Sequence, residues 1–198
     1  WLNRFIQFET LFVGMQYLGS SLLGKSYMGL GRNMAIRREK YNLQFLEKIK
    51  SLTGGDDDLM ISHLAASSQV KIEIRPNSFT SSQPKSSLKT YLKQKIRHLA
   101  AGKHYHKKDQ TLLGIFTLSC VIVWVLFVLL IYFGLNAKLI LMVFGTRSLV
   151  VYLILYRLGR KLNTDIDFWV FPFLDFCYSF YYPWVAVKAL ATKQVEWK

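Results

Sequence analysis

The pattern of hydrophobic and polar positions divides the chain near residue 110. Before this point apolar residues recur at helical spacing among polar ones, and after it they form long continuous runs. Residues 1–23 carry apolar side chains at three- and four-residue intervals, which predicts an amphipathic helix with a wide apolar face. Three further helices are predicted over residues 40–51, 59–67 and 86–101.

Two short segments indicate strands instead. Residues 70–74 (Val-Lys-Ile-Glu-Ile) alternate apolar and charged side chains, which is the pattern of a half-buried strand. Residues 27–30 lie in a passage rich in glycine and are expected to form a short strand that leads into a turn. The part of the chain before residue 110 is therefore expected to mix helices with strands.

Three long apolar stretches follow, and they predict a membrane part. Residues 112–133 carry no charge, and at about 1.5 Å per residue they can cross a hydrocarbon core of about 30 Å. Residues 139–158 predict a second span, interrupted by Arg147. The third stretch, residues 168–191, contains Asp175 and two prolines, so it is either a third span or a re-entrant or interfacial helix.

Charged residues within these stretches and beside them suggest how the membrane part is arranged. Charges inside a membrane are costly and usually face a partner, and we therefore expect Arg147 to pair with Asp175. The basic flanks at residues 97–108 and 157–161 should both be cytoplasmic, with the loop at 134–138 outside. A third crossing would place the last lysines outside, which favours a re-entrant or interfacial third segment.

The balance of charges points to an anionic partner. The chain has 26 Lys and Arg against 12 Asp and Glu, for a net charge of +14. The basic helix predicted within residues 86–108 adjoins the membrane, where it can anchor to anionic lipid, contact a substrate, or do both. We expect no nucleic acid partner, because the basic stretch is juxtamembrane and its aromatic residues are sparse.

A short acidic run, Gly54-Gly55-Asp56-Asp57-Asp58-Leu59, stands out in this basic chain. Three adjacent carboxylates repel one another, which should raise the pKa of at least one unless a cation or a polar substrate offsets the repulsion. By itself such a run is most often a solvated loop. It can also supply a general base, and Gln94 and Arg97 on the basic helix can hold an anionic leaving group. Together these parts describe group transfer from an activated phosphate donor.

Other catalytic and metal-binding patterns are missing from the sequence. There is no Ser/His/Asp arrangement, no Cys/His cluster and no phosphate-binding Walker loop. The four histidines lack a spacing typical of metal ligands, and Cys120 and Cys177 lie in apolar stretches, where we interpret them as small buried hydrophobes.

Three motifs in order resemble the family-2 glycosyltransferases, which are inverting enzymes such as the cellulose and hyaluronan synthases. The motifs are Gly31-x-Asn33-x-Ala35-x-Arg37, then Gly55-Asp56-Asp57-Asp58-Leu59, then Gln94-x-x-Arg97-His98, followed by membrane helices. The resemblance covers residues 1–110. It implies an α/β plus α-helical membrane fold, in which the C-terminal half of a GT-A domain precedes two to three transmembrane or interfacial helices at residues 111–198.

The resemblance also implies roles for individual residues. The catalytic base falls on Asp56 or Asp57, and the acidic-Leu pair that ends the motif favours Asp56. Substrate-binding roles fall on Gly31, Asn33, Asp58, Gln94, Arg97 and His98, of which Gln94 and Arg97 would hold the acceptor end and the departing diphosphate. His98 departs from the family pattern, which usually has Trp there to stack on an acceptor sugar.

The implied reaction moves a sugar from a nucleotide-diphosphate donor to a lipid-linked or polysaccharide acceptor at the inner or plasma membrane, with residues 1–110 cytoplasmic. The full enzyme is expected to use Mg or Mn, with no ligands in this chain, because no Asp-x-Asp precedes residue 56. For the same reason we expect this chain to be the C-terminal part of a longer enzyme. The alternative is a non-catalytic membrane protein whose basic juxtamembrane helix binds anionic lipid or a partner.

Overall fold

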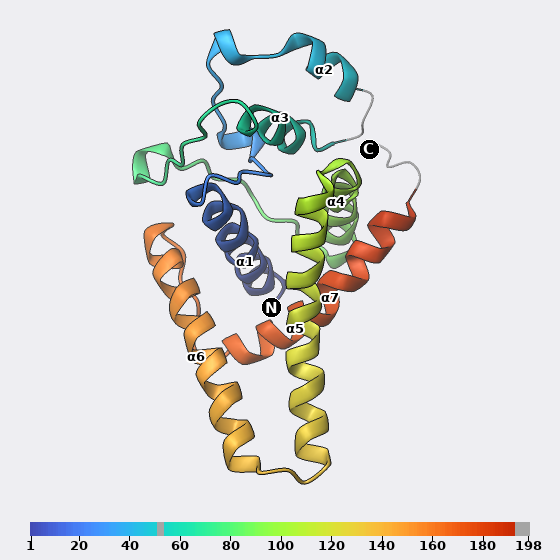
Figure 1. Cartoon of the computed structure of the whole chain (residues 1–198). Helices are drawn as coiled ribbons and strands as arrows, with labels where there is room; N and C mark the ends of the chain where they lie inside the picture. Colours follow the sequence, from blue (N-terminus) through green and yellow to red (C-terminus); the bar gives the residue numbers. More distant parts are fainter. Residues whose placement is uncertain (51–53, 193–198) are drawn as a thin grey trace.

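The computed structural model describes residues 1–50 and 54–192. Within these residues it contains seven α-helices and no strand. The helices are α1 (Leu2–Leu22), α2 (Leu43–Ile49), α3 (Asp56–Ala65), α4 (Leu88–Ala100), α5 (Lys107–Tyr132), α6 (Ala137–Lys161) and α7 (Phe171–Ala191). Figure 1 shows α5 and α6 as a long hairpin, with the other helices gathered around the end of the hairpin opposite its tip.

The two predicted strands are wrong for the described residues, and the α/β part of the predicted fold class is not shown. Residues 27–30 and 70–74 are non-helical, but neither belongs to a ladder in the part of the chain that the structure describes. A strand needs a neighbour to pair its backbone N–H and C=O groups. The alternation at 70–74 is nevertheless reflected in burial, since Val70, Ile72 and Ile74 are half-buried while Lys71 and Glu73 are exposed.

The predicted helices form, with shifted ends that local capping explains. The Asn42 side chain accepts a hydrogen bond of 2.9 Å from the N–H of Phe45, which starts α2 later than predicted. Ser87 caps α4 in the same way through the N–H of Thr90. The predicted end of the first of these helices, at Ser51, falls outside the described residues.

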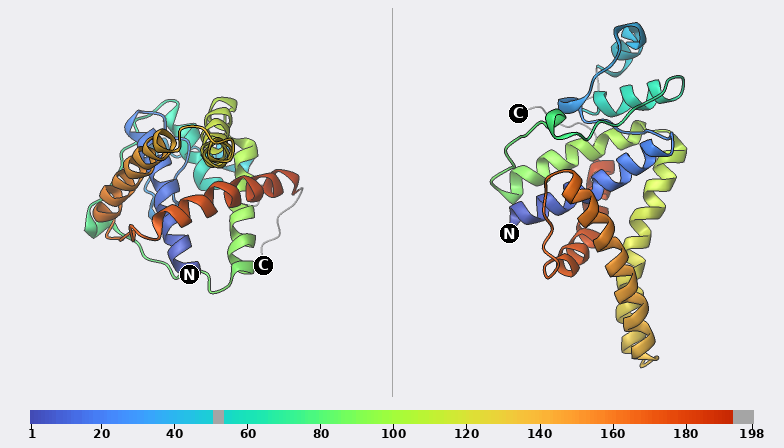
Figure 2. Two further views of the ribbon diagram at one scale, coloured as in Figure 1. Left: turned by 90° about the horizontal axis from the view of Figure 1, so that it is seen from below. Right: turned by 90° about the vertical axis from the view of Figure 1, so that its left-hand side faces the viewer.

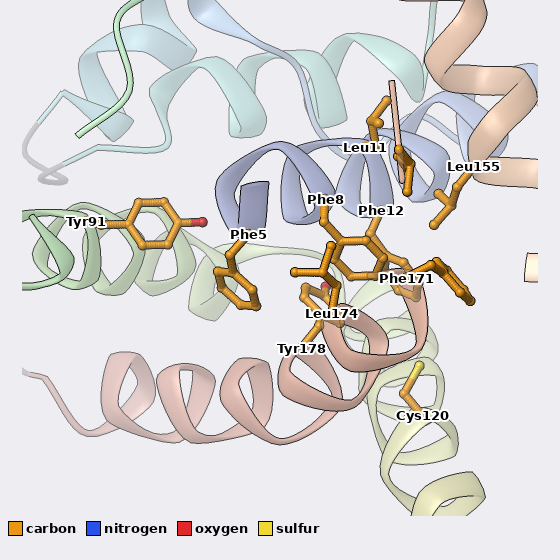
Figure 3. Packing of buried hydrophobic residues seen from close by; sticks show 11 residues of the cluster. Phe5, Phe8, Leu11, Phe12, Tyr91, Cys120, Leu155, Phe171, Leu174 and Tyr178 are labelled. Atoms are coloured by element: carbon orange, nitrogen blue, oxygen red, sulfur yellow. The ribbon is translucent and has the colours of Figure 1, made fainter. Parts of the chain in front are cut away.

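The main hydrophobic core lies between α1 and α7, with contributions from α4, α5 and α6. Its buried side chains are Phe5, Phe8, Leu11, Phe12, Tyr91, Cys120, Leu155, Ile166, Phe171, Leu174 and Tyr178. Figure 3 shows Phe8 and Phe12 of α1 facing Phe171, Leu174 and Tyr178 of α7. The rings of Phe12 and Tyr178 are 4.6 Å apart, so α1 and α7 pack against each other. A smaller core joins α2 to α3 through Ile49, Leu59, Met60 and Leu64.

The two predicted membrane spans correspond to α5 and α6, the described helices that are long and apolar enough to cross a membrane. Many of their large apolar side chains are exposed, which suits contact with lipid. The tip of their hairpin extends beyond every other element (Figures 1 and 2). Helix α7 instead runs across the hairpin rather than along it in Figure 1 and in the left view of Figure 2, the arrangement expected of an interfacial or re-entrant helix.

An ion pair joins these three helices. Arg147 of α6 contacts Asp175 of α7, with its second guanidinium nitrogen 3.4 Å from the other carboxylate oxygen. The indole N–H of Trp124 on α5 donates to the same carboxylate over 3.1 Å. Asp175 is almost fully buried, with only 1% of its surface exposed. The hypothesised partners therefore lie in contact, and the pair fixes where α7 crosses the hairpin.

Replacing either partner alone should destabilise the membrane part strongly, because the other is left as an uncompensated buried charge. We expect a loss of roughly 3–5 kcal/mol for Arg147→Met or Asp175→Leu, and a much smaller loss for the double variant. Thermal unfolding of the purified protein in detergent measures the three values. A double variant as damaged as the sum of the single ones would show that the two residues do not act as a pair.

Candidate active site

A cavity of about 1020 Å³ lies where the start of α3, the loop at residues 27–32, α4, α5 and α7 meet. Its two ends differ in chemistry. The end beneath α3 is lined by the acidic run, by glycines and by the basic face of α4. The other end is lined by apolar side chains of α5 and α7. The cavity therefore joins a charged site to the membrane hairpin.

The three aspartates form the first turn of α3, and the structure gives each a different environment. Asp57 accepts a hydrogen bond of 2.8 Å from the N–H of Gly31. Asp58 is buried and accepts from the N–H of Gly29 at 3.2 Å and from the Tyr105 hydroxyl at 2.6 Å. Asp56 is exposed and accepts no hydrogen bond from any residue that the structure describes. It is the one carboxylate of the three that is left available to a ligand.

Burial changes the acidity of Asp58. Loss of hydration raises its pKa to about 7, the hydrogen bond from Tyr105 opposes this shift, and repulsion by Asp57 adds to it. The sequence pattern led us to expect a raised pKa from mutual repulsion, but burial is the larger cause. Asp58 thus holds the loop and Tyr105 in place, rather than facing the cavity as a free anion.

Two glycines allow the backbone to approach this turn closely. Gly55 precedes α3 with a φ of 84°, in the left-handed region that disfavours a side chain. A Cβ there would overlap the side chain of Ala101. At Gly31 a Cβ would lie 2.9 Å from Oδ2 of Asp57, the same oxygen that accepts the backbone N–H. Gly31 and Gly55 of the sequence motifs therefore allow close packing around the acidic turn.

Basic and polar residues line the same cavity. Gln94, Lys95, Arg97 and His98 of α4 line the cavity together with Arg32 of the loop. The Arg97 side chain passes Gly54, at whose Cα a Cβ would be 3.6 Å from the Arg97 Cγ. Lys95 pairs with the buried Glu9 of α1 over 3.2 Å, which ties α4 to α1. The cavity that the acidic turn lines therefore also has a cationic wall, formed by these basic residues and suited to an anionic group.

His98 contributes no positive charge to this wall. Loss of hydration, together with the charges of Lys95 and Arg97, lowers its pKa to about 4. At neutral pH the imidazole is therefore uncharged and can donate or accept a hydrogen bond. This chemistry differs from the ring stacking expected of Trp at that position.

The structure brings nearly all of the predicted site residues together. Gly31, Asp56, Asp57, Asp58, Gln94, Arg97 and His98 all line the cavity, whereas Asn33 does not. The sequence analysis did not identify Arg32 or Tyr105. Arg32 lies within the first motif, whose spacing could have indicated it, but Tyr105 lies between two histidines in a basic stretch and carries no such signal.

The expected divalent metal stays a prediction. Among residues 1–50 and 54–192 the structure shows no group of three or more His, Cys, Asp or Glu side chains that could hold a metal ion. Asp57 and Asp58 direct carboxylate oxygens to backbone N–H groups and to Tyr105. We therefore assign no step of the chemistry to a metal held by these residues.

A carboxylate available to a ligand lies in the same cavity as a cationic wall and an apolar chamber, which suits group transfer. The whole chain supports this class, because residues 4–198 match the model of glycosyl transferase family 21, and the chain belongs to this family. No curated protein and no solved structure matches the chain. The sequence analysis predicted a glycosyltransferase, and this is confirmed. The family that matches is family 21, whereas the resemblance had been to family 2.

Gly55→Ala should destabilise the protein by about 2–4 kcal/mol, from the left-handed backbone and the overlap with Ala101. Gly54→Ala is the matched control, because its φ is also positive but its Cβ meets only an ordinary contact. We expect Ala101→Gly to recover part of the loss when it is combined with Gly55→Ala. Denaturation midpoints test this, and equal losses for the two alanine variants would contradict the role of the overlap.

Asp58 should make the protein less stable as the pH rises from about 4 to about 7. Its pKa is near 3.9 in an unfolded chain and about 7 in the fold, so the folded state holds the proton more tightly across that window. The contribution to stability is greatest below pH 4 and decreases by at most about 1.4 kcal/mol per pH unit. Thermal unfolding of wild type and Asp58→Asn across this range measures the difference.

The stability of Asp58→Asn is subtracted from that of wild type because His98 also contributes a pH dependence. Since the pKa of His98 is lowered, its contribution to stability rises with pH between about pH 4 and 6.5. Both proteins contain His98, so its contribution cancels. A difference between wild type and Asp58→Asn that does not change with pH would contradict the buried acid.

Proposed function

We propose that this protein transfers a sugar, with inversion, from a nucleotide-diphosphate donor to a hydroxyl group of a lipid-linked acceptor. The observation that carries the proposal is the single cavity that joins the acidic turn and cationic wall to an apolar chamber. Membership of a glycosyltransferase family supports the reaction class. The donor, the acceptor, the inversion and the GT-A architecture of the whole enzyme are parts of the proposal.

Asp56 acts as the general base in this proposal. Its carboxylate takes the proton of the acceptor hydroxyl as that oxygen forms a bond to the anomeric carbon of the sugar. The bond between the anomeric carbon and the diphosphate oxygen breaks on the opposite side. The two electrons of that bond leave with the diphosphate, which gains negative charge. Asp56 is suited to the role because it is exposed and its oxygens accept no other hydrogen bond among the described residues.

The cationic wall stabilises the departing group. Arg97 and Arg32 line the same cavity as Asp56, and guanidinium groups match the paired oxygens of phosphates. Gln94 and the neutral His98 supply hydrogen bonds without further charge, which suits the hydroxyl groups of a sugar or acceptor. Charge that develops on the diphosphate in the transition state is thus met by groups already in place.

The apolar chamber favours a lipid-linked acceptor over a polysaccharide. Leu113, Leu118 and Val121 of α5 and Val187 and Leu190 of α7 line this part of the cavity. A polysaccharide chain would leave its hydroxyl groups unpaired against such a wall, which is costly. Hydrocarbon chains have no hydrogen bonds to lose there, and their transfer from water is favourable.

The alternative was a non-catalytic membrane protein whose basic helix binds anionic lipid or a partner. In the structure Gln94, Lys95 and Arg97 of α4 line the same cavity as the acidic turn. Contact with anionic lipid stays open for the basic residues outside the cavity, such as Lys93 and Lys107, which are exposed. The proposal retains anionic lipid as a second partner and places the basic helix at the cytoplasmic face.

Asp56→Asn should lower sugar transfer by at least about 100-fold, the range expected when a general base is removed. The unfolding temperature should not change, because Asp56 is exposed and its side chain makes no hydrogen bond with a described residue. The measurement is transfer from labelled nucleotide sugars into membrane lipid by the full-length protein in native membranes.

Asp57→Asn is the control, since it removes a carboxylate that holds the N–H groups of Gly31 and Asp58. We expect this variant to lose thermal stability as well as transfer. Normal transfer in both variants would overturn the assignment of the base to the acidic turn.

A further inference from the structure

An ion pair between Glu9 of α1 and Lys95 of α4 has no role in the reaction described above, although both residues line the cavity. Glu9 is 1% exposed and is the only acidic residue within α1. The residues around it on this helix, Phe5, Phe8 and Phe12, all belong to the main hydrophobic core. Packing alone therefore does not explain a carboxylate at this position.

The pair also lacks the further hydrogen bonds that a buried ion pair needs in order to stabilise a fold. Oε2 of Glu9 is buried and has no hydrogen-bond partner among the described residues. Loss of hydration raises the pKa of Glu9, and the charge of Lys95 opposes this shift. An apolar pair of similar size often stabilises a protein as well as a buried ion pair, or better. The pair is thus poorly explained by stability alone.

Glu9 does determine where the ammonium of Lys95 lies. An ammonium group has three hydrogen-bond donors, and the carboxylate of Glu9, at 3.2 Å, is the one acceptor that Lys95 meets within the part of the chain that the structure describes. The Nζ atom also lies 5.6 Å from the centroid of the Tyr91 ring. Lys95 keeps 20% of its side chain exposed and lines the cavity. Two of its donors are therefore left for a ligand.

Lys95 belongs to the same group of positive charges as Arg97 and Arg32. All three residues line the cavity. Besides the loss of hydration, the charges of all three lower the pKa of His98, which requires each of them to lie near the imidazole. His98 follows Lys95 by three residues on α4, and residues three apart are neighbours on a helix surface. The ammonium of Lys95 therefore extends the cationic wall.

We propose that Lys95 is a further binding residue for the diphosphate, and that Glu9 is the positioning residue that holds its ammonium in the cavity. Two donors of Lys95 contact phosphate oxygens, while the third stays on Oε1 of Glu9. A compact ammonium complements the planar guanidinium groups of Arg32 and Arg97, because its donors are not confined to one plane. The identity of the anion as the leaving diphosphate rests on the proposed function, but the anion contact itself does not.

Inorganic pyrophosphate is the probe, and calorimetry on the full-length protein in detergent measures its dissociation constant. Lys95→Met should weaken binding at least about 10-fold, the range expected when a hydrogen bond between charged groups is lost. Lys93→Met is the matched control, because it removes the same charge from the same helix, but Lys93 is exposed and does not line the cavity. Equal affinities for the two variants, or no binding by wild type, would overturn the proposal.

A double variant separates binding from folding. Lys95→Met leaves Glu9 buried without its partner, which destabilises the protein. Glu9→Leu combined with Lys95→Met removes this defect, so the unfolding temperature should return close to that of wild type. The affinity for pyrophosphate should stay at least about 10-fold lower. A double variant that regains both stability and affinity would show that the pair acts only in the fold.

Glu9→Gln and Glu9→Leu test the positioning role. Both remove the same negative charge, and a purely electrostatic effect would strengthen the binding of an anion equally in the two. Only the Gln side chain keeps an oxygen that can accept a hydrogen bond from Lys95. We therefore expect Glu9→Leu to bind pyrophosphate at least about three-fold more weakly than Glu9→Gln. Equal affinities would refute the role of Glu9.

Sugar transfer into membrane lipid, measured for the same variants in native membranes, separates this inference from the proposed function. Pyrophosphate binding that depends on Lys95, without any transfer by wild type, would leave the anion contact intact and refute the proposed function. Transfer by the double variant at the rate of wild type would refute the contact.

Discussion

Three adjacent carboxylates must be held at the start of one helix, and much of the structure around the site is arranged to do so. The positive end of the α3 dipole favours negative charge there, but this alone does not fix the side chains. Asp57 and Asp58 are fixed by backbone N–H groups of the loop at 27–32, and Asp58 also by Tyr105. Because Tyr105 lies two residues before α5, the same carboxylate attaches the acidic turn to the membrane hairpin.

The membrane part in turn shapes the cavity through the position of α7. The ion pair between Arg147 and Asp175, with the hydrogen bond from Trp124, fixes the first half of α7 against both helices of the hairpin. The aromatic core with α1 fixes the same half from the other side. The second half of α7, from Tyr182 onward, then runs past α4 and α5 and supplies one wall of the apolar chamber. The site and the membrane helices are thus one packed unit.

Much of this could be predicted from the sequence, because helical periodicity and uninterrupted apolar runs are local signals. The helices, the two spans and the partners Arg147 and Asp175 were all predictable in this way. The prediction of a strand at residues 70–74 was wrong, since alternation reports which side chains are half-buried and not whether a neighbouring strand exists. Tyr105 escaped prediction because its role depends on a contact with Asp58, 47 positions earlier in the chain.

The acidic run shows why the sequence could indicate the site but could not assign a role to each of its three aspartates. Three identical residues in a row are chemically equivalent on paper, and the resemblance left the base on either Asp56 or Asp57. A helical turn points consecutive side chains about 100° apart, so the three carboxylates meet different neighbours although all three line the cavity. Asp58 points into the fold, and Asp57 toward the loop. Both are stabilised by donors that a free base could not keep while accepting a proton. Because Asp57 and Asp58 are held by hydrogen bonds within the protein, Asp56 is the carboxylate that is accessible to a ligand in the cavity with the cationic wall.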